Sequence, residues 1–102
     1  MMAKLTIDLQ EGFAEETVHI RIAGRQVYQQ EQLSTRNQIG LAASFSIQVE
    51  EGPLSLDVLF PARGDKVEVI NLIIQGDTYL GISLSATGAL EYKASGAPFM
   101  YA

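Results

Sequence analysis

The chain has 102 residues, a length typical of one domain, and it contains no cysteine, which excludes disulfides, thiolate metal sites and cysteine nucleophiles. Its 7 Lys and Arg residues against 12 Asp and Glu residues give a net charge of −5, which disfavours binding to nucleic acid and to anionic membranes. No apolar run has the length of an export signal or of a membrane span. We therefore expect a soluble, cytoplasmic protein with a single domain over residues 1–102.

Alternating apolar and polar residues predict three strands in the first third of the chain, over residues 4–9, 17–22 and 25–30. A two-residue turn that includes Gly24 joins the second strand to the third, and its position is ambiguous by one residue. Residues 33–42 are polar and rich in turn formers, so we expect them to cross from one sheet to another. The predicted inward residues of the first two strands are Leu5, Ile7, Leu9, Val18, Ile20 and Ile22.

The clearest alternation in the chain runs over residues 43–60 and predicts a β-hairpin. Glu51 and Gly52 would form its two-residue turn, which sets Val49 opposite Leu54. Both strands then direct one apolar face toward a common core and one polar face toward water. The predicted inward residues are Ala43, Phe45, Ile47, Val49, Leu54, Leu56, Val58 and Phe60.

Residues 67–74 and 78–84 predict a second hairpin, because Gly76 and Asp77 suit a two-residue turn. The first of these strands is the most apolar in the chain and does not alternate cleanly. The hairpin register decides which of its faces is inward, and it predicts a core face made of Val67, Val69, Ile73, Leu80, Ile82 and Leu84.

A last strand follows, and its turn register sets Leu84 opposite Leu90 and Ile82 opposite Tyr92. Beyond it, residues 97–102 form a short apolar tail. Eight short strands separated by turn signals, with no predicted helix, are typical of an all-β, antiparallel β-sandwich. A closed β-barrel is the alternative architecture.

The sequence offers little chemistry for catalysis or for binding metals. His19 is the only histidine, and no nucleophile, base and orienting group can be assembled around it. The acidic residues at strand ends, which include Glu16 and Asp65, lack the spacing of a calcium loop, so we expect them to be solvated. These observations predict a protein that is not an enzyme and that holds no metal and no cofactor.

The strongest functional signal is the surplus of apolar residues over residues 67–79. The second hairpin would place Ile70, Leu72, Ile74 and Tyr79 on the face opposite the core, where they would form one exposed apolar patch. Such a patch predicts a structural or protein-interaction module that forms a homo-oligomer, most simply a two-fold dimer. The alternative is that the tail, residues 99–102, or the first strand covers the patch within one chain.

A second functional hypothesis places a ligand on the polar face of the first hairpin. Ser46, Gln48, Ser55 and Asp57 would lie together there and would offer hydrogen-bond donors and acceptors to a carbohydrate or another small ligand. The chain contains no tryptophan, which is the side chain that most often stacks on sugars.

Overall fold

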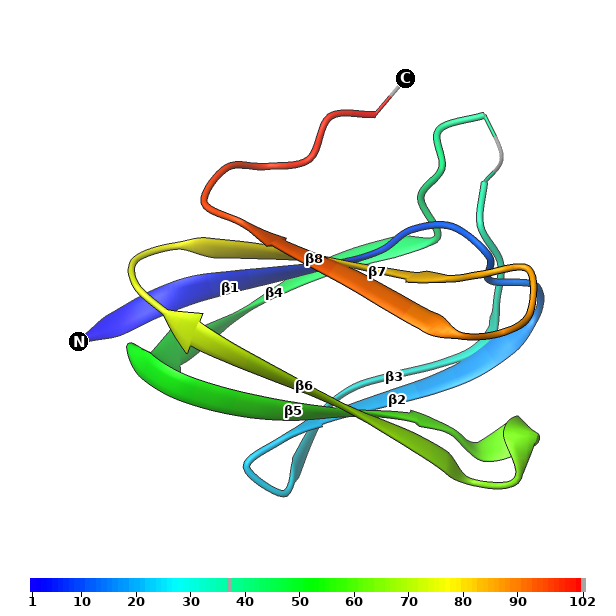
Figure 1. The fold of residues 1–102 in the computed structure, drawn as a ribbon, viewed down its shortest axis with the longest axis horizontal. Helices are drawn as coiled ribbons and strands as arrows, with labels where there is room; N and C mark the ends of the chain where they lie inside the picture. Colours follow the sequence, from blue (N-terminus) through cyan, green and yellow to red (C-terminus); the bar gives the residue numbers. More distant parts are fainter. Residues whose placement is uncertain (37, 102) are drawn as a thin grey trace.

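The computed structural model describes residues 1–36 and 38–101 and contains two four-stranded sheets that face each other (Figure 1). The first sheet has the strand order β4-β1-β7-β8, and the second sheet has the order β3-β2-β5-β6. Neighbouring strands are antiparallel except for β1 and β7, which are parallel. The two open sheets confirm the predicted β-sandwich. The strands are β1 (Met2–Leu9), β2 (Glu16–Ile22), β3 (Arg25–Leu33), β4 (Ala43–Glu50), β5 (Gly52–Phe60), β6 (Lys66–Ile74), β7 (Thr78–Leu84) and β8 (Leu90–Ser95).

Apolar side chains from the inner faces of both sheets form the core. The inner residues of β1, β2 and β5 are those predicted from the alternation. Each fully buried aliphatic side chain contributes roughly 1.5–3 kcal/mol relative to an exposed one. Phe45 and Ile47 face the core as predicted but are only half-buried, because β4 is an edge strand of the first sheet. The fully buried aliphatic residues are Leu5, Ile7, Leu9, Val18, Ile20, Leu56, Val58, Ile70, Ile74, Leu80 and Ile82.

The predicted hairpin over residues 43–60 is wrong, although both of its inward faces are right. β4 pairs with β1 in the first sheet, whereas β5 pairs with β2 and β6 in the second sheet. The chain therefore changes sheets at Glu51, and Val49 does not pair with Leu54. Both strands still face one core because the inner faces of the two sheets are opposed. A short connection between two apolar stripes is thus equally compatible with a hairpin and with a corner between sheets.

The second predicted hairpin is wrong in the same way, and here the error reverses a face. β6 and β7 belong to different sheets, so the connection at Gly76 and Asp77 is another corner. β6 takes its register from β5, which sets Ile70 opposite Leu56 and Leu72 opposite Leu54. Successive side chains in a strand point to opposite faces. The prediction took the register of β6 from β7 instead of β5, and it therefore assigned the outer face of β6 to the core.

The two other hairpins agree with the sequence. β2 and β3 are joined by Ala23 and Gly24, both of which have positive φ values (52° and 76°), which selects one of the two predicted turn positions. β7 and β8 pair with Leu84 opposite Leu90 and with Ile82 opposite Tyr92, as predicted.

The connection between β3 and β4 passes from the second sheet to the first, which confirms the predicted crossover. An isolated antiparallel β-bridge joins Arg36 to Leu41 within this connection. Gly40, just before Leu41, has a left-handed backbone conformation. Asn37 and Ala102, which belong to the predicted crossover and to the predicted tail, lie outside the described residues.

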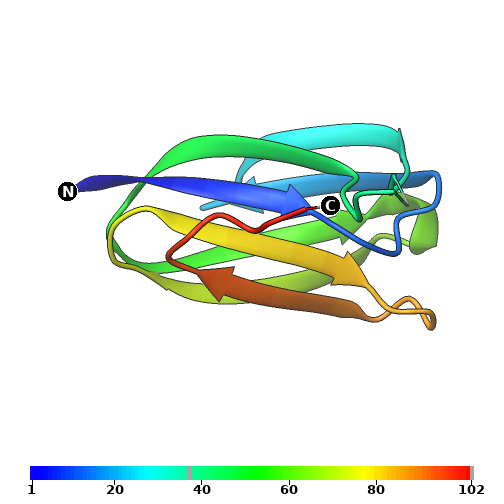
Figure 2. The same ribbon diagram turned by 90° about the horizontal axis from the view of Figure 1, so that it is seen from above.

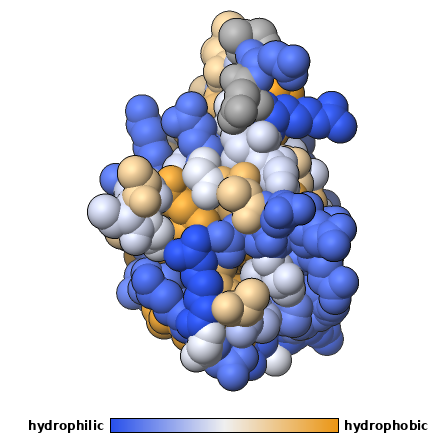
Figure 3. Space-filling model, turned by 90° about the vertical axis from the view of Figure 1, so that its right-hand side faces the viewer, coloured by the Kyte–Doolittle hydropathy of each residue, from blue (hydrophilic) through white to orange (hydrophobic). Residues whose placement is uncertain are grey.

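One end of the sandwich consists of polar loops. There the short helix η1 (Pro61–Arg63) meets the start of β2, and the Arg63 guanidinium donates to both carboxylate oxygens of Glu16, at 3.1 and 2.5 Å. This hydrogen bond and the charge of Glu16 raise the pKa of Arg63. Glu16 is therefore a buried, paired acid and not the solvated one that we expected. Figure 3 shows this end as mostly hydrophilic, with smaller apolar areas near its centre and at its left edge.

No helix in residues 1–36 and 38–101 is long and apolar enough to cross a membrane. Within the same residues, no group of three or more His, Asp or Glu side chains is placed to hold a metal ion.

Candidate functional site

The residues predicted to form an interface lie in the core. Ile70 and Ile74 are at most 1% exposed, and Leu72 is 8% exposed, because β6 directs them toward the first sheet. Tyr79 is half-buried on β7, in the other sheet. The predicted placement of these four residues on one exposed sheet face is therefore wrong. The tail does not cover the three β6 residues either, because residues 97–101 run along the outer face of the first sheet (Figure 2).

The apolar surplus of β6 lies on its other face. Val67, Val69 and Ile73 are 45%, 57% and 63% exposed, and they follow one another along the outer face of the second sheet. We call these three residues the β6 stripe. The neighbouring positions on β5 add Leu59 opposite Val67 and Pro53 opposite Ile73. The sequence therefore predicts correctly that β6 carries apolar residues on both faces, and the structure shows which face is outside.

Beyond Lys66 and Glu68 at its start, the open edge of β6 lacks the features that usually prevent edge strands from pairing with other chains. Such features are charged side chains, proline, short length and bulges. β6 is nine residues long, has no register shift against β5, and carries no charge and no proline from Val69 to Ile74. An edge strand of this kind is a template for pairing with a further strand.

The other three edge strands are less suited to such pairing. β3 contains Arg25, Glu31 and four glutamines, and its pairing with β2 shifts register at two points. β8 is six residues long and carries Glu91 and Lys93. β4 directs serines and Gln48 outward, and its Phe45 stacks on Tyr28 of β3.

The structure divides the predicted ligand face between two sides of the molecule. Ser46 and Gln48 lie on the outer face of the first sheet, and Ser55 and Asp57 lie on the outer face of the second. Ser46 contacts the hydroxyl of Thr6, at 2.9 Å. The Asp57 carboxylate lies 3.8 Å from the guanidinium of Arg21. The four side chains therefore do not form one site.

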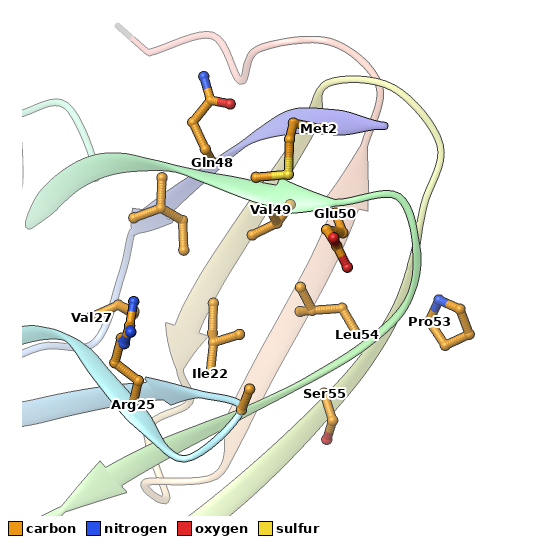
Figure 4. A pocket seen from close by; sticks show the side chains of 12 residues that line it. Met2, Ile22, Arg25, Val27, Gln48, Val49, Glu50, Pro53, Leu54 and Ser55 are labelled. Carbon is orange, nitrogen blue, oxygen red and sulfur yellow. The ribbon is translucent and has the colours of Figure 1, made fainter.

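A cleft of about 660 Å³ opens where β4 and β5 separate from their shared corner and the turn between β2 and β3 approaches them (Figure 4). Gln48 and Ser55, two members of the predicted ligand face, reach it from opposite sheets. Most of its lining is aliphatic, and its charged side chains are those of Arg25 and Glu50. The full lining is Met2, Ile22, Ala23, Arg25, Val27, Ile47, Gln48, Val49, Glu50, Pro53, Leu54 and Ser55.

A buried carboxylate on the outer face of the first sheet anchors the tail. Asp8 is 6% exposed and accepts hydrogen bonds from the Ser44 hydroxyl and from the Tyr101 hydroxyl, both at 2.6 Å. The Gln10 amide donates to the Tyr101 oxygen at 3.0 Å. Gly81 makes room for this arrangement, since a side chain there would overlap that of Gln10. Burial and the hydrogen bond to Asp8 raise the pKa of Tyr101 to about 12.

We expect Tyr101→Phe to lower the free energy of unfolding at pH 8 by about 1–3 kcal/mol, because the buried Asp8 loses a donor. The folded-state pKa of Tyr101 lies above its ordinary value of about 10, so its stabilising effect is complete below pH 10 and is lost as the pH rises through 12. The stability difference between the two proteins should therefore narrow between pH 10 and pH 12 in urea titrations. Tyr92→Phe is the matched control, because the half-exposed Tyr92 hydroxyl has no hydrogen bond among the described residues. A constant difference across this pH range would contradict the assignment.

Sequence reasoning did not identify Asp8, Tyr101 or Arg25 as notable residues. Asp8 occupies an ordinary outward position of an alternating strand, and 93 positions separate it from Tyr101. The lining of the cleft comes from five strands, β1 to β5, and the hairpin prediction wrongly placed two of them, β4 and β5, side by side in one sheet. Comparison of the chain with protein-family models and with curated proteins found no match.

Proposed function

We propose that the protein is a non-catalytic structural or interaction module that forms a homodimer through the open edge of β6. The observation that carries this proposal is the β6 stripe on a nine-residue edge strand whose last six residues, 69–74, carry no charge. An unpaired edge leaves backbone donors and acceptors without partners and exposes apolar side chains beside them. A second copy satisfies both by adding its own β6 to the sheet.

A second copy fits this edge because β6 is complementary to itself in the antiparallel direction. If the two-fold axis passes between the two copies of Asn71, the outer residue Val69 of one strand lies opposite Ile73 of the other. In the same register, the inner residue Ile70 lies opposite Leu72, and the two Asn71 amides can hydrogen-bond to each other. The second sheets of two molecules would then join into one eight-stranded sheet.

We expect the protein to elute as a dimer in size-exclusion chromatography with light scattering, and Ile73→Lys to elute as a folded monomer. The substitution places two ammonium groups near the axis of the dimer without touching the core of either molecule, since Ile73 is 63% exposed. Ile73→Lys should increase the dissociation constant of the dimer at least about tenfold, which corresponds to a loss of about 1.4 kcal/mol of binding free energy.

Tyr92→Lys is the matched control, because Tyr92 is a half-exposed apolar residue on the edge strand of the other sheet. It should leave the dimer intact. A protein that is monomeric at millimolar concentration would refute the proposal. Dissociation by Tyr92→Lys with no effect of Ile73→Lys would assign the interface to β8 instead.

A further inference from the structure

We propose that the cleft between β4, β5 and the turn from β2 to β3 binds a small aliphatic carboxylate. This inference rests on the lining of the cleft and is independent of the β6 edge. The cleft volume of about 660 Å³ lies within the range of about 300–1,000 Å³ that is usual for small-molecule sites.

The walls of the cleft suit an alkyl chain. Ile22, Val27, Ile47 and Leu54 are half-buried: each packs against the core on one side and leaves apolar surface open on the other. Figure 4 shows Ile22 and Leu54 facing the cleft from below and Val49 facing it from β4. No aromatic ring occurs among the described residues that line it, so a sugar would find no ring to stack on.

Two aromatic residues outside the lining stack next to the cleft. Tyr28 of β3 and Phe45 of β4 stack with their ring centroids 4.4 Å apart and their planes inclined by 7°. This contact joins the edges of the two sheets next to Val27 and Ile47. Because the edges are joined there and separate toward Glu51, a ligand enters from the side of the corner.

Arg25 determines the charge that the ligand should carry. The register sets Arg25 opposite Ile22, so its side chain lies on the inner face of the second sheet, beside the apolar lining. The ion pairs among the described residues involve other cations, namely Arg21, Arg63 and Lys66. A guanidinium presents parallel N–H groups that fit a carboxylate.

Glu50, the other charged residue of the cleft, is placed less favourably for a ligand. In Figure 4 it lies across the cleft from Arg25, with Ile22 and Leu54 between them. Glu50 lies opposite Met2 and directly follows the inward-facing Val49, so its position in β4 belongs to the outer face of the sheet. A ligand whose alkyl chain covers Ile22 and Leu54 therefore meets Arg25 at its charged end.

The test uses sodium decanoate, below its micelle concentration, as a probe of the full-length chain, with binding followed by the methyl signals in ¹H–¹³C NMR. We expect saturable shifts at Ile22, Val27 and Leu54. Arg25→Gln should weaken binding about tenfold, because a charge-assisted hydrogen bond is lost. Decan-1-ol should bind to the parent protein about as weakly as decanoate binds to this variant.

Arg36→Gln is the matched control, since it removes one exposed positive charge outside the cleft and should leave decanoate binding unchanged. Val27→Trp should abolish binding of decanoate, because the larger side chain fills the cleft. If the Val27→Trp variant does not fold, the weaker binding expected for Arg25→Gln still tests the site. The absence of any shift, or shifts confined to the β6 stripe, would refute the site. Tighter binding of decylammonium, with a loss on Glu50→Gln, would refute the predicted charge of the ligand.

Discussion

Leu72→Lys should abolish the fold or leave it with little stability. Leu72 is 8% exposed and lies between the sheets, opposite Leu54 of β5. The substitution removes a core side chain and places an ammonium group where no described acid pairs with it. An unpaired buried charge costs several kcal/mol, which is on the order of half of the total stability of a small domain, about 5–15 kcal/mol. Loss of the β-sheet circular dichroism signal at 25 °C, or a large fall in the urea midpoint, would confirm this expectation.

Ile73→Lys provides the contrast, because it changes the next residue along the same strand. Ile73 is 63% exposed, so this variant should keep the fold and its urea midpoint while losing the proposed dimer. If Leu72 lay at a subunit interface, as the hairpin prediction required, the two results would be exchanged. A folded Leu72→Lys protein together with an unfolded Ile73→Lys protein would show that β6 has the opposite register.

The comparison of these two residues shows what the sequence could and could not predict. Alternation predicts which residues of a strand share a face, and this was sufficient for β1, β2 and β5, whose apolar and polar faces differ clearly. In β6 both faces are apolar, so alternation alone does not select the inner one. The choice then depends on the neighbouring strand, and a two-residue connection does not show whether its two strands pair or separate into opposed sheets.

The candidate sites depend on the same information. The cleft exists because β4 and β5 separate at Glu51, and a hairpin in that position would have left no opening between them. The contact between Asp8 and Tyr101 requires the tail to return across the outer face of the first sheet, and no local pattern encodes that path. By contrast, the register of β7 and β8 is local, since a short turn fixes it, and the sequence predicts it correctly.

Gly12→Ala should be the most damaging of the small substitutions in this chain. Gly12 follows β1 with a φ of 87°, a left-handed conformation that costs an alanine about 1–2 kcal/mol. An added Cβ would also overlap the carbonyl oxygen of Leu84, at the end of β7. The neighbouring backbone cannot easily move, because Leu84 N–H donates to the Glu11 carbonyl at 2.8 Å. Overpacking of this kind adds about 1–3 kcal/mol.

Gly24→Ala separates the two causes. Gly24 has a similar φ of 76°, but an added Cβ there would meet no atom within 4 Å. Gly24→Ala should therefore lower the free energy of unfolding only by the cost of the left-handed conformation. Urea denaturation should show that Gly12→Ala lowers the free energy of unfolding by about 1–3 kcal/mol more. Equal losses would mean that the connection after β1 does not lie against Leu84. In that case the parallel pairing of β1 with β7, which brings these two segments together and distinguishes this sandwich from the predicted all-antiparallel one, would be wrong.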